Sequence, residues 1–216
     1  MRISPERIFK KLFRAFGPQG WWPADTPLEV IVGAVLTQNT AWSNVESAIG
    51  NLKSARLLSV RALKKINRQT LAAHIRPAGY FNVKAKRLKN FLTFLQKDFA
   101  GNLKDLFKEE TALLREKLLA VNGIGPETAD SILLYAAGKP VFVVDAYTRR
   151  IFSRIGLVPP DASYTDVQRY VFTRMKPRAN VFNEFHALLV ELAKRNCRIK
   201  PICGNCPLSG DCKKVL

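Results

Sequence analysis

The chain has 216 residues, of which 47% are hydrophobic, enough for one compact unit or two small ones. No apolar run reaches the roughly 18 residues of a membrane helix, and the N-terminus lacks the apolar core of a signal peptide, so we expect an intracellular, cytoplasmic protein. Its 35 lysines and arginines against 17 acidic residues give a formal net charge of +18, which favours a polyanionic partner such as nucleic acid. Lysine-rich thermophile proteins and ribosome-associated proteins carry a similar excess.

Residues 4–16 predict a short amphipathic helix that packs on the core, with Ser4 as its cap. Its apolar stripe contains Ile8, Phe9, Leu12, Phe13 and Phe16. The adjacent Trp21 and Trp22 follow in a segment too rich in glycine and proline for a helix. This aromatic pair either covers the core or has a functional role.

Two capping-box patterns predict the next helix starts. Thr26 with Glu29 precedes a run that is apolar nearly all round and is therefore expected to be buried. Ser43 with Glu46 precedes a second helix, whose predicted core residues are Val45, Ala48, Ile49 and Leu52. The turn between these helices carries Gln38, Asn39 and Trp42, whose polar and planar groups are either ordinary turn chemistry or part of a site.

Two short helices are predicted between residues 59 and 75, and Asn82 is the expected cap of a long helix that follows. The predicted buried stripe of the long helix is Val83, Leu88, Phe91, Leu92 and Leu95. Its first turns carry the basic residues Lys84, Lys86, Arg87 and Lys89. Such a cluster is usually a solvated face, but positive charge opposes the dipole at a helix N-terminus, so a phosphate neighbour would relieve the conflict.

Residues 113–121 and 126–137 predict the two arms of a helical hairpin. The turn between them is Asn122-Gly123-Ile124-Gly125, and Thr128 lies in the first turn of the second arm. Two glycines permit positive φ angles and a close approach of another surface, while the following helix N-terminus directs free N–H groups outward. The hairpin is therefore a candidate phosphate site.

Asp145 ends the apolar run VFVV and begins a further helical pattern. More helices are predicted at 163–175 and 183–196, and no convincing strand pattern or internal repeat occurs, so we expect an all-α protein. All four cysteines lie in the last twenty residues with the spacing C-x5-C-x2-C-x5-C, namely Cys197, Cys203, Cys206 and Cys212. This clustering is typical of ligands to one tetrahedral or cubane metal centre.

The hairpin GIGPETAD, the segment VVDAYTRR and the cysteine run together resemble the endonuclease III (HhH-GPD) superfamily of DNA glycosylases, over roughly residues 21–212. The resemblance implies a two-lobed, all-helical fold with DNA in the cleft between the lobes. Residues 25–136 would form a six-helix barrel lobe with the helix-hairpin-helix, and 1–24 plus 137–216 a lobe carrying the four-cysteine loop. It also implies a 4Fe-4S cluster, although the first cysteine loop is one residue shorter than usual; structural zinc is the alternative.

The resemblance also implies roles for single residues. Cleavage of an N-glycosidic bond builds positive charge on the sugar, and Asp145 would supply the fixed anion, the alternative being a plain helix cap. In the family a Gln at the position of Gln38 fills the space left by an extruded base, with Asn39 beside it. Bifunctional relatives carry a Schiff-base lysine where this chain has Glu127, and a carboxylate cannot form an imine. Glu127 has either a pocket role or only that of a first-turn helix residue.

The segments WWP and LTQNT and the acidic hairpin residue are most similar to endonuclease III-like 3-methyladenine DNA glycosylases. The resemblance therefore implies base excision repair of an alkylated purine by a monomer acting with chromosomal, double-stranded DNA. An alkylated purine is cationic, and Trp21, Trp22 and Trp42 could stack on it. Two alternatives stay open: a bifunctional oxidised-pyrimidine glycosylase and AP lyase using Lys139 or a terminal amine, and a non-catalytic DNA-binding module.

Overall fold

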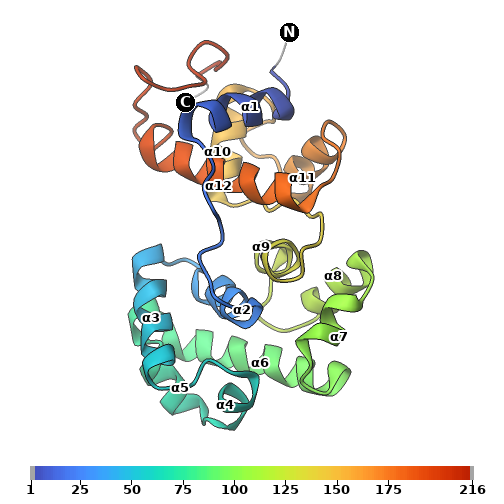
Figure 1. The fold of residues 1–216 in the computed structure, drawn as a ribbon. Coiled ribbons are helices and arrows are strands. Elements are labelled where there is room, and N and C mark those ends of the chain that lie inside the picture. Colours follow the sequence, from blue (N-terminus) through green and yellow to red (C-terminus); the bar gives the residue numbers. More distant parts are fainter. Residues whose placement is uncertain (1–2, 215–216) are drawn as a thin grey trace. The chain divides into compact units, whose positions relative to one another are not determined.

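The computed structural model describes residues 3–214 (Figure 1). Helices are its regular structure, no strand occurs within that range, and the all-α prediction is confirmed. Contacts divide the chain into two compact units, one formed by Ala24–Ala137 and the other by residues up to Pro23 together with those from Gly138 onward. Within the described range, no helix is both long and apolar enough to span a bilayer.

The unit Ala24–Ala137 is built around α2 (Pro27–Leu36), which is buried along nearly its whole length, as its apolar sequence predicts. This helix packs against α3, α6, α9 and η2. In chain order the unit continues with α3 (Trp42–Ser54), α4 (Val60–Lys65), α5 (Arg68–His74), the 3-10 turn η1 (Arg76–Ala78), α6 (Phe81–Phe99), α7 (Leu103–Lys108), α8 (Thr111–Leu119), α9 (Pro126–Ser131) and the π-helical η2 (Ile132–Ala136).

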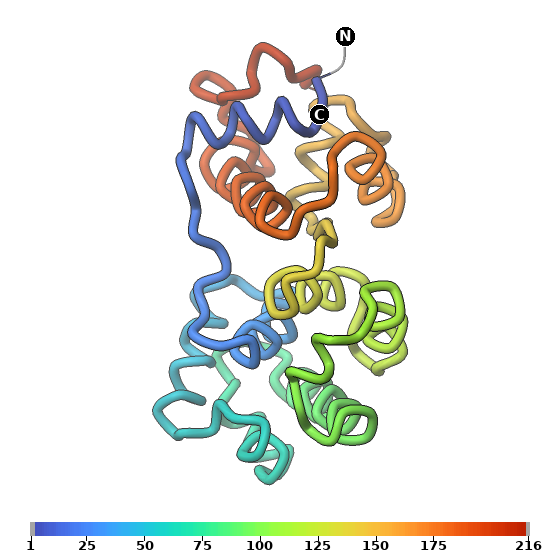
Figure 2. The backbone as a smooth tube through the Cα atoms, turned by 45° about the vertical axis from the view of Figure 1, so that its right-hand side comes forward, coloured from blue at the N-terminus to red at the C-terminus, as the bar shows by residue number. Residues whose placement is uncertain are grey.

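The second unit contains α1 (Pro5–Phe16), α10 (Ala146–Ile155), α11 (Tyr164–Phe172) and α12 (Ala179–Arg195). Helix α12 packs against both α1 and α10, and its core is aromatic, with Phe142, Phe152, Phe182 and Phe185 fully buried. Figure 2 shows α1 beside the segment that follows α12, so the first and last described parts of the chain meet in this unit. An ion pair between Lys11 and Asp211 joins them.

Two of the predicted helix starts are confirmed. Ser4 caps α1, and its side chain accepts a hydrogen bond from the Arg7 N–H. Thr26 caps α2 in the same way by accepting from the Glu29 N–H, while the Glu29 carboxylate accepts from the backbone of Asp25. In both helices proline occupies the first turn, where its missing N–H costs nothing.

Two other predicted caps are wrong. Helix α3 begins at Trp42, before Ser43, because the extended Ala41 already provides the first carbonyl acceptor. Helix α6 begins at Phe81, before Asn82, because Tyr80 turns the chain in the left-handed conformation (φ 44°) and its carbonyl accepts the first helical hydrogen bond. In each case the helix begins before the residue whose side chain was expected to cap it.

The predicted buried stripe of α6 is wrong at its start. Val83 is 47% exposed, whereas the neighbouring Lys84 is 1% exposed. The Lys84 Nζ donates hydrogen bonds to the carbonyl oxygens of Leu36, 2.8 Å away, and Ala78, 2.7 Å away, and to the Thr40 hydroxyl. Burial, with the charge of Arg87, lowers the pKa of Lys84 to about 8. Lys84 is therefore a core residue that ties the end of α2 to η1.

Lys89, five residues further along α6, has a similar role. Its Nζ donates to the carbonyl oxygens of Leu63 at 2.7 Å and Lys64 at 3.0 Å, and to that of Ile66, at the C-terminal end of α4. A cation at a helix C-terminus satisfies carbonyls without helical partners and complements the helix dipole. Two of the four basic residues for which a solvated face or a phosphate neighbour was expected thus stabilise other helices.

Replacing Lys84 should therefore destabilise the fold much more than replacing an exposed lysine on the same helix. Lys84→Met removes the Lys84 donor from the buried Leu36 carbonyl and leaves the Ala78 carbonyl with only the Thr40 hydroxyl, and we expect it to lower the free energy of unfolding by about 2–3 kcal/mol. Lys86→Met on the exposed face of α6 is the matched control and should change it by less than about 0.5 kcal/mol. Denaturant unfolding measures both; equal effects would contradict the structural role of Lys84.

Candidate active site

Asp145 is the N-cap of α10. Its backbone is extended, and its Oδ1 accepts a hydrogen bond from the Thr148 N–H at 2.7 Å. The preceding residues, Val141 to Val144, are buried, so the carboxyl group lies at the point where a buried segment turns into a helix. Its side chain is only 15% exposed. The sequence prediction that Asp145 begins a helix is confirmed.

His186 on α12 is the neighbour of Asp145 that the sequence did not reveal. Its Nε2 lies 3.6 Å from Asp145 Oδ2, and the residue is 6% exposed. Burial by itself would raise the pKa of Asp145, but the charge of His186 and the hydrogen bond from Thr148 bring it below its ordinary value. A single histidine within an apolar helix carries no sequence signal for a contact so far along the chain.

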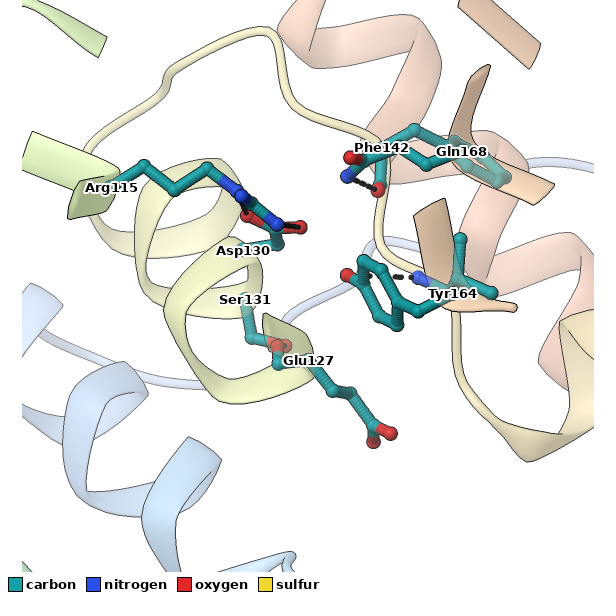
Figure 3. Close-up of polar contacts among 8 residues, drawn as sticks. Arg115, Glu127, Asp130, Ser131, Phe142, Tyr164 and Gln168 are labelled. Atoms are coloured by element: carbon teal, nitrogen blue, oxygen red, sulfur yellow. Dashed lines mark hydrogen bonds and ion pairs between the residues drawn. The ribbon is translucent and has the colours of Figure 1, made fainter. Parts of the chain in front are cut away.

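The backbone that leads to Asp145 is held by α11. Gln168 Nε2 donates to the Phe142 carbonyl oxygen at 2.8 Å, and the Val144 N–H donates to the Tyr164 hydroxyl at 3.4 Å (Figure 3). These two side chains replace the backbone partners that an extended segment lacks. The position of Asp145 is therefore fixed from α11 as well as from α10 and α12.

The hairpin turn in the other unit uses its two glycines differently. Gly123 has a φ of +96°, and a Cβ built on it would lie 2.3 Å from Arg87 Cγ. Gly125 has an ordinary φ of −93°, serves as the N-cap of α9, and has open space where a Cβ would be. Only the first glycine therefore needs the left-handed region. Ile124 is buried beneath the turn, and the Asn122 carbonyl accepts from Asn90 Nδ2 at 2.9 Å.

Gln38 is bonded to this turn. Its Nε2 donates to the Gly123 carbonyl oxygen at 3.1 Å and to the Thr128 hydroxyl at 2.8 Å, and its Oε1 accepts from Arg87. The following residue, Asn39, is exposed with a φ of +55°. Hydrogen bonds thus join the segment after α2 to the hairpin turn within the unit Ala24–Ala137.

Glu127 lies in the first turn of α9, where a negative charge is favoured by the helix dipole. Figure 3 shows its carboxylate pointing away from the neighbouring pair of Arg115 and Asp130. In that pair, which the sequence did not predict, Arg115 donates to both oxygens of the fully buried Asp130, at 2.6 and 3.1 Å. A bidentate bond of this kind fixes α8 against α9, the two arms of the hairpin.

The three tryptophans are divided between the two compact units. Trp21 and Trp22 belong to the same unit, with ring centroids 5.4 Å apart, and the Lys194 Nζ lies 6.0 Å from the Trp21 ring. Trp42 opens α3 in the unit Ala24–Ala137. All three rings are half-buried.

The four cysteines line one cavity of about 70 Å³ and are all free thiols. Burial raises the pKa of the Cys206 thiol, and the other three cysteines add to this effect. Within residues 3–214 no three His, Cys, Asp or Glu side chains are grouped for a single metal ion. The donor set nevertheless fits a metal centre, because four thiols face one space and a bound cation would reverse the cost of ionising them.

Helix α10 binds this cysteine loop directly. Arg150 Nε donates to the Cys197 carbonyl oxygen at 2.9 Å. Arg154 Nη1 lies 3.6 Å from Cys197 Sγ, and its Nη2 donates to the Ile199 carbonyl oxygen at 2.8 Å. The helix that begins at Asp145 therefore ends against the cysteines.

Comparison with known proteins gives consistent matches across the chain. A Methanocaldococcus jannaschii protein named as a candidate DNA repair glycosylase is 46% identical over 208 residues, covering 95% of this chain and 94% of that protein. Endonuclease III of Sulfolobus acidocaldarius is 31% identical over 194 residues, covering 86% and 81%. The solved structure of H. pylori 3-methyladenine DNA glycosylase bound to 1,N6-ethenoadenine is similar with a TM-score of 0.79 and 31% identity, covering 89% of this chain and 98% of that one.

The family model of the HhH-GPD superfamily base excision DNA repair proteins matches residues 32–177, a range that contains the hairpin, Glu127 and Asp145. This match confirms the resemblance found in the sequence. The chain belongs to the HhH-GPD superfamily of base excision DNA repair proteins.

Proposed function

We propose that this protein is a monofunctional DNA glycosylase that hydrolyses the N-glycosidic bond of a flipped alkylated purine, such as 3-methyladenine, in duplex DNA. The observation that carries the proposal is an ionised, mostly buried Asp145 at a helix N-terminus, in a chain whose hairpin has Glu127 where bifunctional relatives have lysine. The H. pylori relative is named a 3-methyladenine DNA glycosylase, which supports the same substrate class.

Asp145 would act on the charge that develops as the bond to the base breaks. The sugar becomes oxocarbenium-like, and a fixed carboxylate beneath C1′ stabilises it more than the uncharged ground state. The lowered pKa of Asp145 keeps this group anionic at neutral pH. The same carboxylate can orient or activate the attacking water.

The presence of Glu127 favours hydrolysis of the base over the lyase reaction that cleaves the strand. A lyase step needs an amine that forms an imine with C1′, and a carboxylate cannot provide one. The second candidate function is a bifunctional glycosylase and AP lyase acting on oxidised pyrimidines, which the likeness to an endonuclease III favours. It would need an amine from elsewhere, such as the half-buried Lys139 or the chain terminus.

We assign DNA binding to the hairpin assembly and base stacking to the tryptophans. The N–H groups at the start of α9 would meet a phosphate, with Asn122, Gly123, Ile124 and Gly125 forming the close backbone surface. Because the Gln38 amide already bonds Gly123 and Thr128, its part is to hold the turn, and the exposed Asn39 is the better-placed contact. Trp21, Trp22 and Trp42 are the rings available to stack on a cationic base.

The four cysteines would hold a 4Fe-4S cluster, with structural zinc as the alternative. Base hydrolysis transfers no electrons, so the group when bound would supply structure: it would close the loop formed by Cys197, Cys203, Cys206 and Cys212. Arg150 and Arg154 then connect that loop to α10.

Base release from defined duplexes tests the function. Wild-type protein should release 3-methyladenine faster than thymine glycol or uracil, and Asp145→Asn should lower the single-turnover rate by a factor on the order of 10²–10³ while keeping affinity for DNA. Release of only the oxidised pyrimidine would refute the alkylpurine assignment.

The controls separate the remaining candidates. A non-catalytic binding module would lose nothing on Asp145→Asn. Borohydride reduction during the reaction should trap no protein–DNA adduct, and a trapped adduct would establish the lyase function instead.

We expect alanine substitutions at the two hairpin glycines to have different effects. Gly123→Ala meets Arg87 and a φ of +96°, so we expect it to lower the free energy of unfolding by about 1–3 kcal/mol. Gly125→Ala has room for its methyl group, so it should keep most of the stability but weaken DNA binding about tenfold by filling the surface assigned to the phosphate. Gly50→Ala in α3, also with open space, is the control. Unchanged DNA affinity in Gly125→Ala would remove the turn from the interface.

Metal analysis of protein purified without oxygen tests the cofactor. We expect about four iron and four sulfide per chain, with broad visible absorption. Cys203→Ser should lose iron and lower the melting temperature, whereas Ser209→Ala, a change beside the same cavity, should keep both. A colourless protein with one zinc would show that the alternative is correct.

A further inference from the structure

The two oxygens of Asp145 face different partners. Oδ1 accepts the Thr148 N–H, a bond that any aspartate at a helix start can make. Oδ2 lies 3.6 Å from the Nε2 of His186, which comes from a different helix. One hydrogen bond from the helix cap restrains the terminal torsion of the carboxyl group only loosely, because that torsion is broad and both oxygens move with it. A partner at Oδ2 restricts that rotation.

His186 is held in place by its surroundings. It lies in the middle of α12, between the fully buried Phe185 and the buried Ala187, and α12 packs against α10, the helix that Asp145 caps. A buried imidazole is costly unless its nitrogens have polar partners, and this cost keeps it directed at a carboxylate. The position of His186 is thus as rigid as the core around it.

We propose that His186 is a positioning residue for Asp145: it holds Oδ2 while Thr148 holds Oδ1, so that the carboxylate has one orientation toward the scissile sugar. The proposal rests on the proposed function of Asp145 and extends it. A catalytic group must be placed to well within 1 Å, because a misplacement of that size costs on the order of a hundredfold in rate. For this contact Nε2 must carry a hydrogen.

Three variants test the proposal. His186→Leu removes the donor, and His186→Gln keeps an N–H at a similar reach. His74→Leu changes the only other histidine of the chain, on α5, and is the matched control. The assay is single-turnover release of 3-methyladenine from duplex DNA methylated with dimethyl sulfate, with a thymine glycol duplex in parallel and DNA affinity and melting temperature recorded for each protein.

We expect His186→Leu to lower the rate on the order of a hundredfold at unchanged DNA affinity, His186→Gln to recover most of the rate, and His74→Leu to have no effect. A His186→Leu protein that is folded and as fast as wild type would overturn the proposal. Should His186→Leu fail to fold, His186→Gln decides, because a rate far below that of wild type in a folded protein would overturn the donor role.

A double-mutant cycle separates positioning from a general structural effect. If His186 acts through Asp145, His186→Leu should cost nothing further in an Asp145→Asn background. The same fold-loss in both backgrounds would overturn the proposal. Full activity of Asp145→Asn alone would instead refute the proposed function, so the two failures can be distinguished.

A titration gives a readout that needs no substrate. The carboxyl carbon of Asp145, followed by NMR in protein with labelled aspartate, should titrate at a higher pH in His186→Leu than in wild type, because the His186 charge that lowers the pKa of Asp145 is lost. His74→Leu should leave this titration unchanged. An unaltered Asp145 titration in folded His186→Leu protein would overturn the contact itself, even if neither duplex proves to be a substrate.

Discussion

The central constraint on this site is that the mostly buried Asp145 carboxylate stays ionised. Burial of Asp145 works against its ionisation, and the charge of His186 on α12 together with the Thr148 N–H at the start of α10 offsets that effect. The Nε2 of His186 lies 3.6 Å from the second oxygen of Asp145. The buried residues before Asp145 and the α11 side chains that bond their backbone keep the carboxylate at this position. The packing of α10, α11 and α12 thus keeps this carboxylate in place and lowers its pKa.

Positive charge is used in two ways in this chain. Much of the +18 excess is on the surface, where a polyanion would meet it. Lys84 and Lys89 are used inside the unit Ala24–Ala137 instead, as donors to carbonyls at the ends of α2 and α4. Arg87 lies between them and bonds Gln38, which in turn bonds the hairpin. The basic helix α6 is therefore a scaffold for the candidate DNA-binding turn as much as a charged face.

The sequence predicts what local interactions determine. Ser4, Thr26 and Asp145 cap helices because each side chain reaches an N–H three residues ahead, and the apolar run of α2 can only be buried. Prediction failed where a residue's role depends on distant parts of the chain. Lys84 is buried because carbonyls from α2 and η1 converge on it, and His186 meets Asp145 because α12 packs against α10. Neither contact leaves a pattern in the spacing of residues.

The cysteine loop and the Asp145 carboxylate lie at opposite ends of α10. Helix α10 begins after Asp145 and carries Arg150 and Arg154 to the loop; α12 carries His186 and ends just before Cys197. Helix α10 has ten residues and is therefore about 15 Å long, which separates the Asp145 carboxylate from the cysteine loop. Any influence of the loop on Asp145 must then pass through the placement of α10 and α12. The loop follows α12 in the chain and accepts hydrogen bonds from Arg150 and Arg154 of α10, so it joins the two helices that carry His186 and are capped by Asp145.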